Sequence, residues 1–257
     1  MYVNLFFKSG GAVAQLGERL NGIQEADGSI PFSSTNLPPL RTPPQMKQEG
    51  ANRQIAADAF HWDNLSQLHP ADVCNRTDAL YHPTEEGYIL PVYHLRYLIT
   101  PKTRKIVRVE WNDQTVVEKL HPFFVLMVLV YLTGAKEIEP ENRWVSEKDL
   151  KGGTNFFQGP HSLQLRELED LYGKDPEAFL EAGRRLGGKE ISFANKSFAL
   201  NAFPKIPLAY LLWEGDEEFS PKIRVLFDST IQSHLPLDII WCMVAETSRR
   251  LAEQTTL

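Results

Sequence analysis

The apolar run from Phe123 to Leu132 limits the fold more than any other feature of this chain. A membrane-spanning helix needs about 20 such residues, so this run is too short to cross a bilayer. Its large side chains would point in nearly every direction around a helix, which requires protein on all sides. We therefore predict a central buried helix from Pro122 to about Leu132, ended by Gly134, and no membrane span.

Residues 10–35 have the form of a translated tRNA gene rather than of a protein segment. The stretch Val13–Arg19 can be encoded by GTAGCTCAGCTGGGAGAGCG, the form of a D-arm, and Gly28–Pro31 by GGTTCGATCCC, the form of a T-arm. Between them, Leu20–Gln24 can be encoded by a stem around GGC, an alanine anticodon. The alternative interpretation is an ordinary flexible tail rich in Gly, Ser and Pro.

On the tRNA interpretation, residues 1–45 are a disordered and spurious extension, and Met46 is the native start. The remaining 212 of the 257 residues are enough for one domain with a full hydrophobic core. We expect the genomic DNA to hold a tRNA gene over codons 10–35, and deletion of residues 1–45 to leave the Tm unchanged. A clear drop in Tm would contradict this boundary.

Charge and cysteine content exclude several classes of protein. The net charge is -6 and no Lys/Arg cluster is present, so we expect no nucleic-acid partner. Cys74 and Cys242 lie far apart and cannot by themselves build an iron–sulfur or zinc site. We interpret them as free thiols in a reducing cytoplasm, because no signal peptide precedes them. The cofactor stays unassigned.

Periodicity and caps predict an α+β fold, with a largely antiparallel sheet and packed helices in a single domain. Further helices are expected at Gln48–Phe60, from Pro70, at Ser162–Tyr172, at Pro176–Leu186 after an Asp175 N-cap, and at Pro236–Ala252. Apolar alternation predicts one hairpin from Tyr88–Ile99 and Lys105–Trp111, and another from Ile206–Trp213 and Lys222–Phe227. Short strands are expected at Glu190–Phe193 and Ser197–Phe203.

The connector of the second predicted hairpin carries the most concentrated candidate site. Glu214, Asp216, Glu217 and Glu218 follow Trp213 within five positions, and Asp228 comes soon after. Hard cations such as Mg²⁺ and Ca²⁺ bind oxygen ligands of this type. The alternative is a solvated turn whose charges protect a sheet edge.

Two other features are candidates for ligand binding or catalysis. His234 precedes the last predicted helix and could form an acid/base pair with Asp228, or make only a structural hydrogen bond. Phe156 and Phe157 lie in a predicted loop from Lys151 to Pro160, where they could line a ligand pocket or fix the loop to the core. No zinc-hydrolase, P-loop or dinucleotide motif is present in the sequence.

Several motifs together resemble those of DUF3786, a bacterial and archaeal family of domains of unknown function. They are Leu212–Phe219 with Leu226–Asp228 and His234–Pro236, His69–Cys74 with Asp78-Ala79, Lys151–Gly153 before Phe156-Phe157, and Gly173–Phe179 leading to Leu186–Gly188. The resemblance covers about Leu65 to Leu251. It implies an anaerobic host, and some members resemble fusions with a four-cysteine module like that of corrinoid iron–sulfur proteins. This chain lacks that module, and the family assigns no catalytic residue.

Two functional hypotheses follow from these observations. The first is a cytoplasmic, non-catalytic binding or accessory protein for anaerobic metalloenzyme or one-carbon metabolism, with a corrinoid or iron–sulfur protein as partner. The second is a small hydrolase or transferase that uses the carboxylates between Glu214 and Asp228, with His234 as acid/base and a divalent metal. Carboxylates that point into solvent would remove the support for the second hypothesis.

Overall fold

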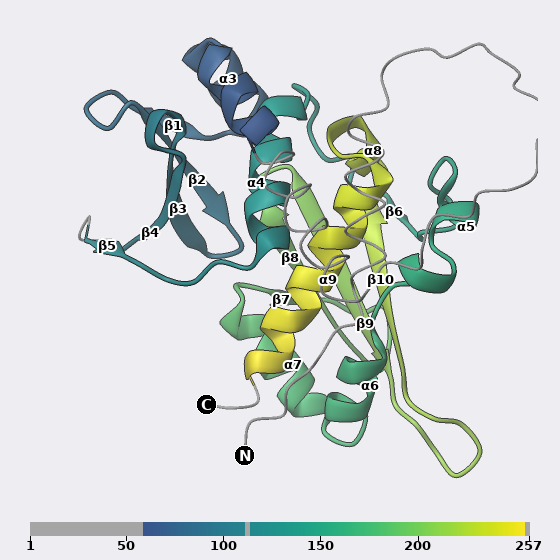
Figure 1. Ribbon diagram of the computed structural model, residues 1–257. Coiled ribbons are helices and arrows are strands. Elements are labelled where there is room, and N and C mark those ends of the chain that lie inside the picture. The colour runs from purple at the N-terminus through teal and green to yellow at the C-terminus, as the bar shows by residue number, and fades with distance from the viewer. Residues whose placement is uncertain (1–58, 111–113, 255–257) are drawn as a thin grey trace, which may run out of the picture. The chain divides into compact units, whose positions relative to one another are not determined.

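The computed structural model describes residues 59–110 and 114–254, and residues His61–Leu257 cluster as one compact unit. This unit contains two antiparallel five-stranded sheets with helices packed against them (Figure 1). The α+β prediction is confirmed, but the division of the strands into two sheets was not foreseen from the sequence. The predicted helix at Gln48–Phe60 lies outside the described residues except for its last two positions, and the boundary at Met46 lies outside them altogether.

The first sheet is a meander in which every strand pairs with its neighbour in the chain. Its strands are β1 (Leu80–His82), β2 (Gly87–Val92), β3 (Leu95–Thr100), β4 (Lys105–Val109) and β5 (Thr115–Val116). The predicted hairpin around Pro101 is present as β3 and β4. The stretch predicted as one strand at Tyr88–Ile99 is instead two strands, because Tyr93 has a positive φ of 55° and reverses the chain.

The second sheet has the order β6-β10-β9-β8-β7. Its strands are β6 (Trp144–Val145), β7 (Lys189–Glu190), β8 (Lys196–Phe203), β9 (Ile206–Trp213) and β10 (Lys222–Asp228). The predicted second hairpin is confirmed, with Lys222 opposite Trp213 as its last pair. In Figure 1 the connection between β9 and β10 projects beyond α6 (Arg166–Tyr172).

The remaining helical elements include one over residues 59–67. The others are α3 (Pro70–Thr77), α4 (Pro122–Gly134), α5 (Gly153–Phe156), the 3-10 turns η1 (Pro101–Thr103) and η2 (Gly159–His161), α7 (Pro176–Arg185), α8 (Ile231–His234) and α9 (Leu237–Glu253). The predicted N-cap of α7 is confirmed, because the Asp175 side chain accepts a hydrogen bond from the Ala178 N–H. Helix α6 begins four residues later than predicted. The Ser162 carbonyl accepts from the indole N–H of Trp241 instead of continuing a helix.

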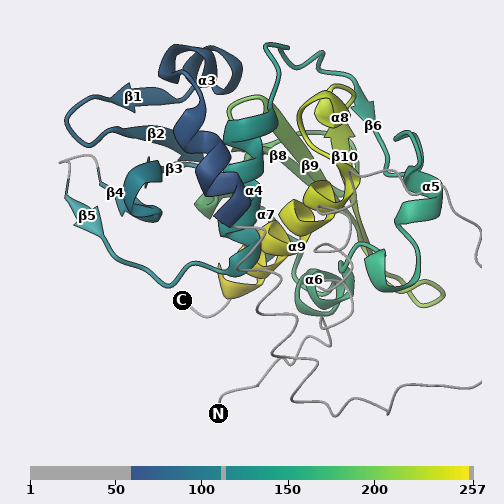
Figure 2. The same cartoon turned by 45° about the horizontal axis from the view of Figure 1, so that its top comes forward.

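Helices α4 and α9 form the layer that covers one face of the second sheet, and both views show α9 crossing its strands (Figures 1 and 2). The apolar run in α4 is buried as predicted, with Val125 alone half-buried. Tyr131 of α4 joins this layer to the sheet by stacking on Phe203 of β8, with 4.3 Å between ring centroids. The Tyr93 N–H donates to the Ala202 carbonyl and joins the two sheets. No helix among the described residues is long and apolar enough to cross a membrane.

Candidate functional site

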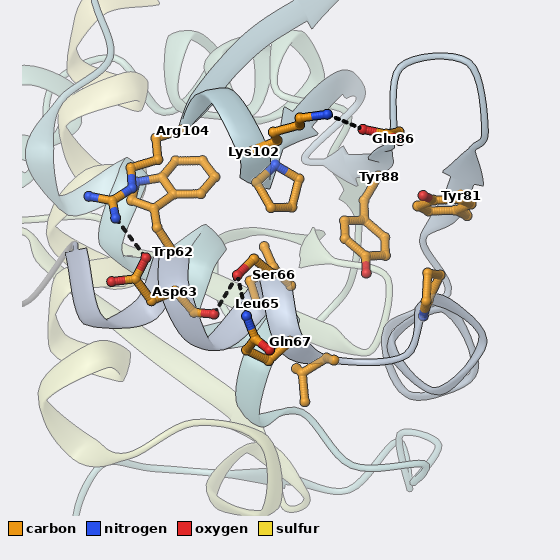
Figure 3. Close-up of a pocket in the computed structure, with 13 residues that line it drawn as sticks. Trp62, Asp63, Leu65, Ser66, Gln67, Tyr81, Glu86, Tyr88, Lys102 and Arg104 are labelled. Carbon is orange, nitrogen blue, oxygen red and sulfur yellow. Dashed lines mark hydrogen bonds and ion pairs between the residues drawn. The ribbon is translucent and has the colours of Figure 1, made fainter.

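A pocket of about 520 Å³ opens between the helix over residues 59–67 and the first sheet (Figure 3). This volume is in the range of sites that bind small molecules, about 300–1,000 Å³. The helix and the start of α3 form one wall, and β1, β2 and η1 form the other. Its lining residues are Trp62, Asp63, Leu65, Ser66, Gln67, Leu68, Pro70, Tyr81, Glu86, Tyr88, Pro101, Lys102 and Arg104.

Three aromatic side chains supply the flat surfaces of this pocket. Trp62 comes from the helix and is 6% exposed, and Tyr88 is the second residue of β2 and is 2% exposed. Tyr81 lies directly opposite Tyr88 in the β1–β2 register, so both side chains point to the same face of the sheet. Their rings meet edge to face with 5.5 Å between centroids. Sheet pairing therefore fixes two of the three rings relative to each other.

The Tyr88 hydroxyl is the most distinctive polar group of the pocket. Figure 3 shows it pointing into the space between the two walls. Burial raises the pKa of Tyr88 to about 12, so the hydroxyl stays protonated at neutral pH. No other described residue forms a hydrogen bond with it. The protonated hydroxyl can therefore donate a hydrogen bond to an oxygen or nitrogen acceptor of a bound molecule.

Two ion pairs neutralise most of the charge at the rim. The Arg104 guanidinium is 2.6 Å from Asp63, and the Lys102 ammonium is 3.2 Å from Glu86. All four side chains are about half exposed or more, so these pairs contribute little to stability. They leave a pocket with aromatic walls and hydroxyl donors but without strong net charge.

The acidic connector lies elsewhere and faces solvent. Glu214, Asp216, Glu217 and Glu218 are all exposed. The Asp216 carboxylate accepts hydrogen bonds from the N–H groups of Glu218 and Phe219, which stabilises the turn. Within residues 59–110 and 114–254, no three His, Cys, Asp or Glu side chains gather as a group that could hold a metal ion. Trp213 is half-buried beside the connector, with the Arg224 guanidinium 5.7 Å from its ring centroid.

Asp228 and His234 are buried, and each contacts the segment between α4 and β6. Asp228 Oδ1 accepts from the Glu141 N–H and from both the N–H and the hydroxyl of Thr230. His234 Nδ1 accepts from the Lys136 N–H at 3.4 Å. No hydrogen bond joins Asp228 to His234 in the structure. Both side chains thus hold loop backbone in place.

The pKa shifts of these two groups follow from their surroundings. Burial alone raises the pKa of Asp228, but the hydrogen bonds from Thr230 and from the backbone of Glu141 and Asn142 outweigh it, so the net pKa is below the usual value. Burial and the positive charge of Lys205 lower the pKa of His234. At neutral pH, Asp228 is therefore ionised and His234 is neutral.

Phe156 and Phe157 are both half-buried near the end of α5. Phe156 stacks on His161 with 4.6 Å between ring centroids. Phe157 lines a second cavity, of about 470 Å³, between α6 and β10. The structure therefore separates the candidate residues: the connector carboxylates are exposed, Asp228 and His234 are buried, and Phe157 but not Phe156 lines this second cavity.

The residues of the first pocket were missed by sequence reasoning. Trp62 lies 26 positions before Tyr88, and only the packing of the helix on the sheet brings them together. The sole signal was the abundance of Tyr between residues 81 and 97, which strands also require for their cores.

Comparison with known proteins gives one match. A family model described as a domain of unknown function, DUF3786, matches residues 69–250. No curated protein and no solved structure matches the chain. The matched range contains all strands from β1 to β10 and most of α9, and it begins just after the helix over residues 59–67. The chain therefore belongs to the DUF3786 family.

Proposed function

We propose that this protein is a binding domain whose ligand occupies the pocket in Figure 3. The observation that carries the proposal is the Tyr88 hydroxyl, which points into the pocket and forms no hydrogen bond with another described residue, on a buried ring that packs edge to face against Tyr81. Ligand sites combine apolar and aromatic walls with a few polar groups that orient the bound molecule. This arrangement suits a flat organic molecule with oxygen or nitrogen acceptors at its edge.

The same geometry argues for binding rather than turnover. The first sheet supplies rings and hydroxyl donors, while the carboxylates at the rim are occupied by Lys102 and Arg104. The hydrolase or transferase hypothesis requires the connector carboxylates to lie together with His234. The carboxylates are instead on an exposed turn, and His234 is buried and accepts a hydrogen bond from a loop N–H, so no observation favours that second function.

We further propose that the domain acts as a cytoplasmic accessory protein in anaerobic metalloenzyme or one-carbon metabolism. The support is membership of the DUF3786 family, some members of which resemble fusions with corrinoid iron–sulfur modules. Affinity capture of the full chain from its native host under anaerobic conditions tests this. We expect a corrinoid or iron–sulfur protein to co-purify. Its absence from reciprocal captures would contradict the partner assignment, without bearing on the pocket.

The pocket is tested with 8-anilino-1-naphthalenesulfonate, an aromatic probe with oxygen acceptors. We expect one binding site on the full chain and amide chemical-shift changes confined to residues 59–70, β1, β2 and η1. Tyr88→Phe removes only the hydroxyl, so affinity should fall by up to about tenfold, the value of one hydrogen bond. Trp62→Leu should weaken binding further.

Trp213→Leu is the matched control, because it makes the same substitution at a half-buried tryptophan that lies outside this pocket. Its probe affinity should equal that of the unmodified chain. Shift changes that map to β10 or α9, or equal affinities for the Trp62→Leu and Trp213→Leu variants, would overturn the pocket assignment. Circular dichroism of each variant separates loss of binding from loss of folding.

A further inference from the structure

The outer edge of β10 is incompletely paired. Phe227 and Asp228 pair with β6, and at the other end the Ile223 N–H donates to the Glu169 carboxylate at 3.0 Å. Backbone groups alternate in direction along a strand, so Val225 between them faces the same outer edge. Its N–H and C=O form no hydrogen bond with any other residue in the described part of the chain.

A groove replaces the strand that would normally cover this edge. If β6 were longer and kept the same antiparallel register with β10, it would pair with Val225. Strand β6 instead ends at Val145, opposite Phe227. The Asp149 carboxylate accepts from the N–H and hydroxyl of Ser146, which turns the chain away. The resulting cavity of about 470 Å³ is bounded by residues 146–148, by Phe157 and by α6 with the residues before it. The open space thus lies along the strand edge itself.

The rim of the groove is basic, although the chain as a whole carries a charge of -6. Four cationic side chains surround it, Lys148, Arg166, Lys222 and Arg224, against the two carboxylates Glu147 and Glu169. Glu169 is already paired with Lys222 at 2.9 Å. No ion pair with a described residue engages Lys148, Arg166 or Arg224.

We propose that this groove binds an extended acidic segment of a partner protein, which continues β6 and pairs with β10 at Val225. Strand addition to an exposed sheet edge obtains affinity from main-chain hydrogen bonds, and side-chain contacts give specificity. The N–H and C=O of Val225 can form the main-chain hydrogen bonds, and the basic side chains of the rim can form the side-chain contacts. This site is separate from the pocket in Figure 3, so either proposal can fail alone.

The probe is the peptide acetyl-Glu-Val-Glu-Val-Glu-amide, titrated into the full chain by calorimetry at low salt. We expect binding, and slower hydrogen exchange of the Val225 amide in the complex. N-methylation of the central glutamate, or replacement of the glutamates by lysine, should each weaken binding by about tenfold or more. The double variant Arg166→Glu/Arg224→Glu should weaken it by a similar factor.

Lys105→Glu/Lys119→Glu is the matched control, because it changes the net charge by the same amount at two exposed sites away from the groove. Lys105 begins β4, and Lys119 lies between β5 and α4. It should bind the peptide like the unmodified chain. Equal affinity for the N-methylated peptide, unchanged exchange at Val225, or no binding at about 1 mM peptide would overturn the proposal. So would Val225 protection that rises with protein concentration alone, since a second copy would then occupy the edge.

Discussion

Replacing Glu246 by alanine is expected to lower the free energy of unfolding by about 3–5 kcal/mol, because it breaks a buried ion pair and leaves a buried charge. The Glu246 side chain in α9 is fully buried. Its carboxylate accepts two hydrogen bonds from Arg249 and one from Arg250. The Arg250 guanidinium lies over the Phe124 ring at 4.7 Å and is only 13% exposed. Urea denaturation followed by circular dichroism measures the loss.

The chain contains its own control for this experiment. Glu181 in α7 has Arg184 and Arg185 at the same spacings, but its side chain is 49% exposed. Glu181→Ala should therefore change stability far less, since solvent screens the charges that remain. Glu246→Gln, which keeps the volume and one acceptor oxygen, should lie between the two alanine variants. Equal losses for Glu246→Ala and Glu181→Ala would contradict the role of burial.

Replacing Asp228 by alanine is expected to lower the free energy of unfolding by about 3 kcal/mol, because hydrogen bonds to a charged group contribute about 1.5–3 kcal/mol each and their donors would stay buried. Asp228 is 1% exposed and holds the Glu141 loop and Thr230 to the end of β10. Asp228→Asn retains an acceptor oxygen and should lose less. The same urea titrations measure both variants.

The stability that Asp228 contributes depends on pH in a defined direction. Its folded-state pKa is below the ordinary value, so the contribution is complete above the unfolded pKa of about 3.9 and is lost as pH falls through the lower folded value. The difference between the unmodified chain and Asp228→Asn should thus be largest near neutral pH and shrink below about pH 4. A difference that grows on acidification would contradict this assignment.

Local sequence signals predicted the elements that local chemistry decides. Asp175 and Pro176 start α7, the alternation on both sides of the acidic connector forms β9 and β10, and the apolar run forms α4. The turn at Tyr93 was missed because neither Tyr93 nor His94, which lie between β2 and β3, is a glycine or a proline. Its positive φ is accompanied by contacts from distant residues, including the hydrogen bond between its hydroxyl and that of Thr247.

The candidate sites also differ in whether their residues are close together or far apart in the sequence. The connector motif was visible because its carboxylates are adjacent in sequence, yet the structure places them in solvent. The pocket and the groove are formed by segments far apart in the chain, as where Trp62 approaches Tyr88 and Phe157 approaches β10. Gly183 is a related case: a glycine inside α7 looks unfavourable, but a Cβ there would lie 2.5 Å from the Phe198 ring.

By itself the sequence determined the α+β class, the buried central helix and the family motifs, because periodicity, caps and apolar runs act over a few residues. Only the tertiary structure decided what each polar group does. The patterns from Glu181 to Arg185 and from Glu246 to Arg250 have the same spacing of charges. The pattern at Glu181 is exposed to water, whereas the pattern at Glu246 is covered by α4 and the first sheet. The energy of a charge depends on its solvent environment, which distant parts of the chain create.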